Sequence, residues 1–189
     1  MKPLDPEITS LLKSAPAPIN NTRRLLRAPA PFSRKAPHWI MTKIRKSTLT
    51  DGTRVMEIWR RAVDATHDFL SPGDRRDIEA EVAAFLPGAP LDLAVDETDR
   101  AIGFMLLDGS HMEALFVDPD FRGSGIGRTL VEDAVKRHPD LSTEVNEQNL
   151  QAIGFYERLG FERCGRSAID GQGRPYPLIH LRCAGTSLG

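Results

Sequence analysis

The amino-acid sequence predicts an α/β protein of the α+β kind, with one mixed, mostly antiparallel sheet and helices on both of its faces. Two observations lead to this fold class. Segments with strand-like and helix-like spacing of apolar residues follow one another in the order β-α-α-β-β-β-α-β-α-β-β. Three strand-like segments in the middle have no helix between them, which favours an antiparallel meander over repeated β-α-β units. The length of 189 residues suits one domain with a modest tail.

The individual elements are predicted from periodicity and from the residues that interrupt it. Strand-like segments cover residues 42–48, 91–97, 101–109, 111–119, 141–146, 161–170 and 176–183. Helix-like segments cover residues 51–70, 74–86, 126–138 and 149–160. Pro72 and Gly73 separate the first two helices, Pro119 ends the third strand of the meander, and Gly160 ends the last helix.

Composition excludes several classes of protein. Hydrophobic residues make up 40% and charged residues 27% of the chain, which is ordinary for a soluble domain. We expect no membrane helix, because no apolar run approaches the length of about 20 residues that one needs. The net charge of −1 offers no general attraction for nucleic acid. Cys164 and Cys183 have no metal-ligand spacing, so we expect two reduced thiols, no metal and a cytoplasmic protein.

The first forty residues differ from the rest in composition. They hold seven of the 14 prolines and seven basic residues against two acidic ones. Prolines at this density prevent long helices, so residues 1–40 are interpreted as a basic, mostly irregular extension. A transit peptide, a docking segment and a true start of translation at Met41 remain alternatives. The domain itself is expected over residues 41–185, with residues 186–189 as a tail.

A glycine-rich turn precedes the third helix. In "FRGSGIGRTLVEDAV", Gly123, Gly125 and Gly127 fall between a strand and a helix start. Such a turn exposes backbone N–H groups next to the positive end of the helix, which is typical of an anion site. A P-loop is excluded because no Gly-Lys-Ser/Thr follows, and a dinucleotide site is disfavoured because β-α-β units are missing. A tight turn without ligand is the remaining alternative.

The residues around this turn carry a family resemblance. The stretch "FVDPDFRGSGIGRTLV", followed by "NEQNLQAIGFYERLGF", resembles the GCN5-related N-acetyltransferase (GNAT) superfamily. The resemblance covers essentially residues 43–183 and leaves the first forty residues outside. It implies the GNAT fold, in which two strands splay apart at the acetyl-CoA site. It also implies an enzyme that transfers an acetyl group from acetyl-CoA, as co-substrate, to a primary amine.

The resemblance implies a set of residues that bind the coenzyme. The amides of the turn would face the diphosphate, and the strand before it would pair with pantetheine through its main chain. Two asparagines and one aromatic residue would also contact the coenzyme, although Asn149 could equally be a helix cap. The full set is Leu115, Phe116, Val117, Arg122, Gly123, Ser124, Gly125, Ile126, Gly127, Arg128, Asn146, Asn149 and Phe155.

The same resemblance suggests the catalytic residues. Tyr156 stands where the family carries its general-acid tyrosine, although its spacing alone fits a core aromatic. The base that removes a proton from the amine is expected to be Glu113 or His111, with His67 as a further candidate. The remaining alternative is that the enzyme has no dedicated base. Glu113 and His111 are two positions apart on one predicted strand and therefore share a face. A histidine would titrate near neutral pH.

The acceptor is the least defined part of this interpretation. Its groove would include Trp59, His67 and Phe69, unless Trp59 is a core residue. The resemblance favours a lysine of a protein as acceptor, with a small-molecule amine as the alternative. A catalytically idle sensor that binds acyl-CoA is a further alternative. We expect a monomer or homodimer with neither nucleic acid nor membrane as partner.

Overall fold

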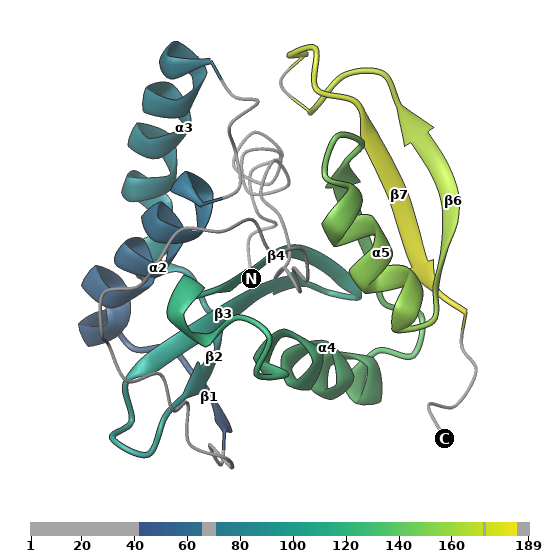
Figure 1. Ribbon diagram of the computed structural model, residues 1–189. Coiled ribbons are helices and arrows are strands. Elements are labelled where there is room, and N and C mark those ends of the chain that lie inside the picture. The colour runs from purple at the N-terminus through teal and green to yellow at the C-terminus, as the bar shows by residue number, and fades with distance from the viewer. Residues whose placement is uncertain (1–41, 66–70, 172, 185–189) are drawn as a thin grey trace, which may run out of the picture.

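The computed structural model describes residues 42–65, 71–171 and 173–184. Figure 1 shows the helices, which are α2 (Gly52–Asp64), α3 (Pro72–Phe85), α4 (Ile126–Arg137) and α5 (Leu150–Arg158). The strands are β1 (Lys43–Lys46), β2 (Asp92–Val95), β3 (Ala101–Asp108), β4 (His111–Val117), β5 (Ser142–Asn146), β6 (Phe161–Ser167) and β7 (Leu178–Cys183). This order confirms the predicted α+β class, and the meander is β2, β3 and β4.

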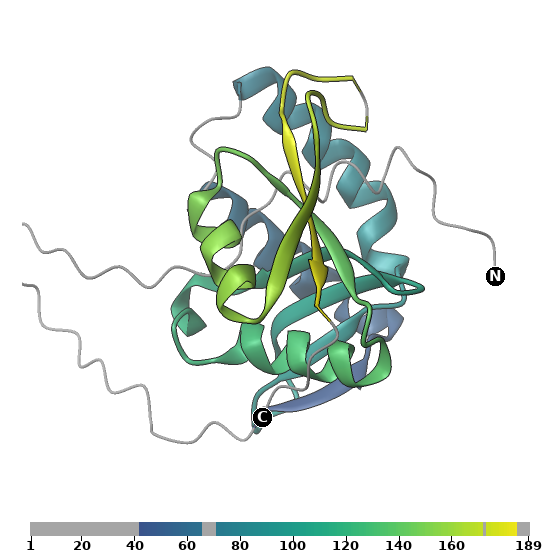
Figure 2. The same ribbon diagram turned by 90° about the vertical axis from the view of Figure 1, so that its right-hand side faces the viewer.

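The strands of the described residues form one sheet in the order β1-β2-β3-β4-β5-β7-β6. Neighbours are antiparallel except for β4 and β5, which run parallel. The parallel pair has only two residue pairs, His111 with Ser142 and Met112 with Thr143. Beyond these the two strands separate, so the sheet has a first arm of β1 to β4 and a second arm of β5, β7 and β6 (Figure 2).

Two apolar cores lie on opposite faces of the first arm. On β4, Leu115 and Val117 pack into a core shared with α4 and α5, whereas Ala114 and Phe116 pack into a core shared with α2 and α3. This alternation is what a strand buried on both faces requires. Helix α4 lies close to the sheet, since a Cβ added at Gly103 of β3 would stand 3.1 Å from Cγ2 of Ile126. The first turn of α4 is therefore held against the end of β4.

Several predicted boundaries were wrong by two or three residues: β2, β4 and β6 end at Val95, Val117 and Ser167 instead of 97, 119 and 170, and β7 begins at Leu178 instead of 176. Helix α3 begins at Pro72 instead of residue 74, because Ser71 caps it and its hydroxyl accepts a hydrogen bond of 3.1 Å from the Asp74 amide. Proline is tolerated in the first turn of a helix, where its missing N–H has no partner to lose. The last residues of the predicted helix 51–70 lie outside the described residues, as does the extension of residues 1–40.

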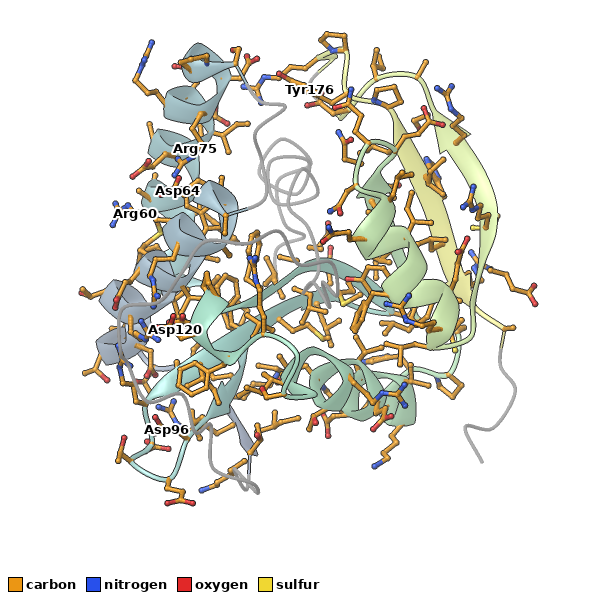
Figure 3. All side chains as sticks on the ribbon, in the orientation of Figure 1. Arg60, Asp64, Arg75, Asp96, Asp120 and Tyr176 are labelled. Atoms are coloured by element: carbon orange, nitrogen blue, oxygen red, sulfur yellow. The ribbon has the colours of Figure 1, made fainter. Side chains whose placement is uncertain are left out.

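Helices α2 and α3 are tied together by Arg75 of α3. Its guanidinium lies 2.9 Å from the Asp64 carboxylate and 2.7 Å from that of Glu79 (Figure 3). The same group stacks over the Trp59 ring, with 4.8 Å to the ring centroid. Trp59 itself is 1% exposed. A stacked cation of this kind adds to the packing of a buried indole, so the pair links α3 to α2.

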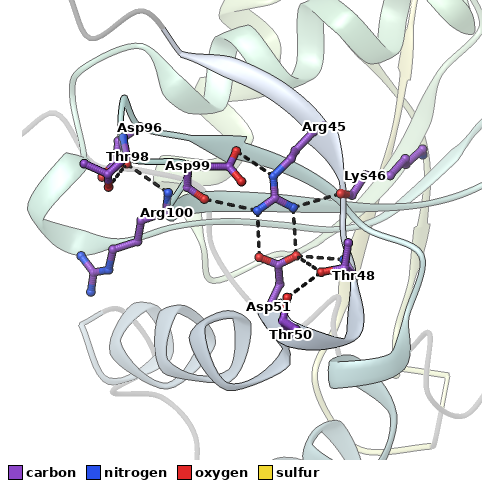
Figure 4. A network of polar contacts seen from close by, with 9 residues as sticks. All are labelled: Arg45, Lys46, Thr48, Thr50, Asp51, Asp96, Thr98, Asp99 and Arg100. Carbon is purple, nitrogen blue, oxygen red and sulfur yellow. Dashed lines mark hydrogen bonds and ion pairs between the residues drawn. The ribbon is translucent and has the colours of Figure 1, made fainter.

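The opposite edge of the first arm is fixed by Arg45 of β1. Its guanidinium makes two hydrogen bonds of 2.9 Å to Asp51 and one of 3.0 Å to Asp99 (Figure 4). This bidentate contact holds the pKa of the Asp51 carboxyl well below its usual value. The edge strand, the start of α2 and the turn between β2 and β3 are joined by this one side chain.

None of the described helices combines the length and the apolar composition that a membrane span requires.

Candidate functional site

The glycine turn leaves the end of β4 and leads directly into α4. Gly123 and Gly125 have φ angles of 77° and 89°, a backbone conformation that other residues adopt only with strain. Gly125 is the N-cap of α4, and a Cβ added there would meet no atom within 4 Å. Open space therefore lies beside the first turn of the helix, where the N–H groups have no partner within the helix.

A pocket of about 170 Å³ occupies this space. Part of its wall is the turn and the start of α4, and another part is the last turn of α5. The lining residues are Val117, Phe121, Gly123, Gly125, Ile126, Gly127, Arg128, Phe155, Arg158 and Leu159. Backbone amides, the positive end of a helix and two arginines together favour an anionic group here, as the sequence predicts.

The separation of β4 from β5 begins at the side of this pocket. After Met112 and Thr143, the edge of β4 that faces β5 has no strand partner in the described structure. A strand edge of this kind can pair with an extended, amide-bearing ligand. Leu115 and Val117, predicted to act through their main chains, lie on this stretch, and both side chains are buried. Phe116 packs its side chain on Phe104 in the other core.

Two buried asparagines stand where β5 meets α5. The Asn146 side-chain oxygen accepts a hydrogen bond of 2.8 Å from the Gln148 amide, and that of Asn149 accepts one of 3.1 Å from the Ala152 amide as the N-cap of α5. The side-chain NH₂ groups of both residues are buried without a hydrogen-bond partner among the described residues. An unpaired buried donor is costly, so these two groups fit a site for the carbonyl oxygens of a ligand.

Tyr156 lies at the point where the two arms separate. It is 5% exposed and packs against Phe155 and Phe161. Its hydroxyl is partnered by Thr143 of the last parallel pair, whose own hydroxyl donates to the Met112 carbonyl oxygen at 2.9 Å. Burial raises the pKa of Tyr156 above its usual value, and the Thr143 contact only partly opposes this. The phenol is therefore kept protonated and can donate a hydrogen bond.

His111 and Glu113 form a second polar group at the same point. Their side chains approach to 3.9 Å, and Nδ1 of His111 lies 2.8 Å from the Ser142 hydroxyl. Glu113 lies in a β-bulge, because Met112 and Ala114 pair with adjacent residues of β3 and Glu113 is the extra residue between them. A bulge redirects its side chain relative to plain alternation. The expected shared location of the two residues is nevertheless present.

The side chain of Arg122 points away from the pocket. It donates to the Ala62 carbonyl oxygen of α2 at 3.2 Å. Burial lowers the pKa of its guanidinium, and the charge of Asp118 opposes the change. Arg128, in contrast, lines the pocket, although it also pairs with Glu132 at 3.4 Å. Of the two arginines expected at the rim, the structure places only Arg128 in the pocket wall.

A buried charge cluster supports the turn from behind. Asp118, with 1% of its side chain exposed, lies 2.5 Å from Arg54 and 2.7 Å from Arg61. Arg61 also reaches Asp120 at 2.9 Å. These contacts attach α2 to the residues that connect β4 with the glycine turn. Sequence reasoning missed the cluster, because nothing in the spacing of charges along the chain relates positions 54 and 61 to position 118.

The remaining residues predicted for the site differ in where the structure places them. Phe155 lines the pocket, and Ser124 turns its hydroxyl onto the Phe121 carbonyl oxygen at 2.5 Å. The burial of Trp59 favours the core interpretation of that residue. His67 and Phe69 lie outside the described residues. Metal-ligating side chains do not cluster anywhere in the part of the chain that the structure describes.

Three lining residues were missed from the sequence: Phe121, Arg158 and Leu159. Arg158, the last residue of α5, and Leu159, its C-cap, lie three and four residues after Phe155 and so share its helix face. That periodicity was a signal that could have found them. Arg158 has no acidic partner among the described residues, which adds a free positive charge to the wall of the pocket.

Comparisons with known proteins place these features in context. Residues 77–173 match the family described as "Acetyltransferase (GNAT) domain". The chain is 55% identical to the peptidyl-lysine N-acetyltransferase YjaB of Salmonella typhimurium over 142 residues, which are 75% of this chain and 98% of that protein. The solution structure of the apo form of YjaB from Escherichia coli matches with a TM-score of 0.74 and 53% identity, over 77% and 99% of the two chains.

A further match concerns the fold alone. A GNAT phosphinothricin acetyltransferase from Sinorhizobium meliloti, solved in complex with AcCoA, matches with a TM-score of 0.50. Its identity is 21%, over 75% of this chain and 86% of the other.

Proposed function

This chain belongs to the GNAT acetyltransferase family, and from that premise we propose that it moves the acetyl group of acetyl-CoA to the side-chain amine of a lysine in a protein. The observation that supports acetyl-CoA as the acetyl donor is the pocket at the first turn of α4, beside the separating strands β4 and β5. The proposal of a protein lysine as the acceptor rests on the likeness to YjaB, which extends over almost the whole of that curated protein.

The residues present support binding of the diphosphate and pantetheine parts of acetyl-CoA. The amides of the turn and the positive end of α4 suit the diphosphate, with Arg128 and Arg158 in the wall of the same pocket. The open edge of β4 suits the amides of pantetheine. The unpaired NH₂ groups of Asn146 and Asn149 suit carbonyl oxygens of the ligand. These features would lead the thioester toward the Tyr156 hydroxyl.

The chemistry requires that protons move in both directions. A lysine amine has a pKa of about 10.4, so at pH 7 only roughly one in a few thousand is neutral and able to attack. In the proposal, Glu113 and His111 accept the proton that the acceptor ammonium loses. The amine nitrogen then forms the C–N bond and gives up a second proton to water, and the C–S bond breaks with its electron pair left on sulfur.

Tyr156 completes the reaction in this proposal. Its hydroxyl donates to the departing sulfur and regains a proton from solvent. The sum is ammonium plus thioester giving amide, free thiol and one proton released to water. Because its buried phenol is held in the protonated form, Tyr156 is ready to donate at every neutral or mildly alkaline pH. We place this reaction in the cytoplasm, where thiols such as exposed Cys164 are kept reduced.

The test uses the full chain with acetyl-CoA and a panel of lysine-containing peptides. Release of free thiol is followed spectroscopically, and the acetylated residue is located by mass spectrometry. The proposal expects acetyl-lysine in the peptide and a mass gain on its side-chain nitrogen. Binding of acetyl-CoA without turnover on any peptide or small amine would instead indicate an idle sensor. Turnover confined to small amines would replace the acceptor class.

A further inference from the structure

The segment that leads from β4 to the glycine turn is attached to helix α2 at three positions. The Asp118 carboxylate lies 2.7 Å from the guanidinium of Arg61, which also reaches the Asp120 carboxylate at 2.9 Å. The third position is Arg122, whose guanidinium donates to the Ala62 carbonyl oxygen at 3.2 Å. The whole segment is therefore held against α2 up to the residue before the first glycine.

Asp118 is the centre of these contacts. Its side chain is buried between two arginines of α2 and lies 2.5 Å from Arg54. Its Oδ1 accepts a hydrogen bond of 3.1 Å from the Asp120 amide, and its backbone N–H donates to the Ile102 carbonyl oxygen of β3 at 2.9 Å. Asp118 thus joins α2 and the sheet to the 3-10 helix Pro119–Phe121, which leads into the glycine turn.

The glycine turn is costly to order. Gly123 and Gly125 both have positive φ angles, and a Cβ at Gly125 would meet no atom within 4 Å. Glycine loses more conformational freedom than any other residue when its backbone is fixed. A ligand that bound a loose turn would have to order it, and its affinity would fall by that amount. Contacts that order the turn before the ligand arrives therefore raise the affinity.

The residues that attach the segment to α2 do not line the pocket. The pocket wall includes Phe121, Gly123 and Gly125, but neither Asp118 nor Arg61. These two side chains can therefore order the turn only through the backbone that leads into it. They act on the amides that a diphosphate would meet, without contact with the diphosphate itself.

We propose that Asp118 and Arg61 are positioning residues for the coenzyme, and that their ion pair orders the amides of the glycine turn before the diphosphate of acetyl-CoA binds. The inference rests on the proposed function and deepens it, because it names side chains that set the affinity for acetyl-CoA from outside the pocket. It concerns the diphosphate alone, since pantetheine would bind to the open edge of β4.

The charge of Asp118 allows positioning to be separated from simple electrostatics. Asp118 is a carboxylate behind the turn, so its charge by itself disfavours a bound diphosphate. Asp118→Asn removes this charge and keeps the size of the side chain and one acceptor oxygen. Electrostatics alone predicts that the variant binds acetyl-CoA more tightly than the wild type. Loss of the ion pair with Arg61 predicts weaker binding.

The experiment compares acetyl-CoA with acetyl-pantetheine, which lacks the diphosphate. Both Kd values are taken from the shifts of the β4 amide resonances in the ¹⁵N-labelled full chain. Asp118→Asn is expected to raise the Kd of acetyl-CoA about tenfold, comparable with the cost of fixing the backbone of one residue, and to leave that of acetyl-pantetheine unchanged. Asp120→Asn makes the same charge change on a side chain that is 72% exposed, and this matched control is expected to behave as the wild type.

Arg61→Lys tests the other partner without a change of charge. Lysine has no planar fork with which to reach both carboxylates at once. We expect the Kd of acetyl-CoA to rise about threefold, the scale of one partly exposed ion pair, and that of acetyl-pantetheine to stay the same. Arg60→Lys, one position earlier on α2 and 48% exposed, is the matched control. Arg61→Lys decides the test if circular dichroism shows that Asp118→Asn does not fold.

Unchanged or tighter binding of acetyl-CoA by folded Asp118→Asn would overturn the inference, as would equal losses for the two ligands. A wild-type Kd in Arg61→Lys would show that charge alone suffices and would overturn the positioning role of Arg61. The proposed function is read separately, from acetyl-lysine formed by the wild type. A wild type that binds acetyl-CoA but acetylates nothing would refute that function and leave the variants to decide the inference. A wild type that does not bind acetyl-CoA would overturn both.

Discussion

The Tyr176 hydroxyl donates a hydrogen bond of 2.7 Å to Oδ2 of Asp74, across 102 positions of sequence. Tyr176 belongs to the connection between β6 and β7, and Asp74 to the first turn of α3 (Figure 3). The Ser71 hydroxyl also donates to this oxygen, at 2.8 Å, and Arg174 lies 3.9 Å from the other one. Because β4 and β5 separate after two residue pairs, this cluster is a second connection between the arms of the molecule.

Tyr176→Phe removes the donor and keeps the ring. We expect faster amide hydrogen exchange at Gly173, Arg174 and Tyr176 and in the first turn of α3, because local opening no longer breaks this hydrogen bond. Exchange in β3 and β4 should not change. Asp77→Asn, an exposed position on the same helix, is the control. Equal exchange in the variant and the wild type would show that the contact does not join the arms.

Tyr156→Phe tests the proposed proton donor. We expect kcat to fall by about two orders of magnitude, the lower end for a positioned general acid, while the KM of acetyl-CoA changes little. The phenyl ring should keep its contacts with Phe155 and Phe161, so circular dichroism and the midpoint of unfolding serve as checks on the fold. A variant with wild-type kcat would exclude Tyr156 from the reaction.

The raised pKa of Tyr156 also predicts how stability depends on pH. In the unfolded chain the phenol ionises near its ordinary value of 10.0, and in the folded protein only at a higher pH. Its contribution to the free energy of unfolding is therefore intact below pH 10 and is lost as the pH rises toward the folded-state pKa. Urea unfolding between pH 8 and pH 11.5 should show a steeper loss for the wild type than for Tyr156→Phe. Parallel curves would contradict the assignment.

Asp118→Ala tests the cluster behind the glycine turn. We expect a loss of about 3 kcal/mol in the free energy of unfolding, because Arg54 and Arg61 would lose their buried partner. Asp120→Ala is the matched control, since its side chain is 72% exposed and such pairs contribute at most about 1 kcal/mol. Similar losses in the two variants, measured by urea unfolding, would mean that burial of Asp118 does not matter.

The sequence was sufficient to predict features that depend on neighbouring residues, but not those that depend on contacts between residues far apart in the chain. The glycine turn, the N-cap Asn149 and the helix face of Phe155 are local features, so spacing along the chain was enough to find them. The direction of the Arg122 side chain could not be predicted, because it is set by the Ala62 carbonyl oxygen on a helix sixty positions away. The start of α3 differs from the predicted one because proline, which interrupts the interior of a helix, is tolerated in its first turn.

The residues of the candidate site fall into the same two groups, those close together in the chain and those brought together by strand pairing. Glu113 and His111 were found together because they lie two positions apart on one strand. Thr143 of β5, which contacts the Tyr156 hydroxyl, pairs with Met112 of β4. This parallel pairing joins strands that are far apart in the chain, so residue spacing does not encode it.

The central claim is that main-chain amides of residues 123–128 bind the diphosphate of acetyl-CoA. The most direct test follows the backbone amide resonances of the ¹⁵N-labelled full chain during titration with acetyl-CoA and, separately, with acetyl-pantetheine, which lacks the diphosphate. We predict that acetyl-CoA shifts the amides of the turn and of β4, whereas acetyl-pantetheine shifts those of β4 and leaves the turn unchanged. Binding of acetyl-CoA that leaves the amides of residues 123–128 in place would contradict the account.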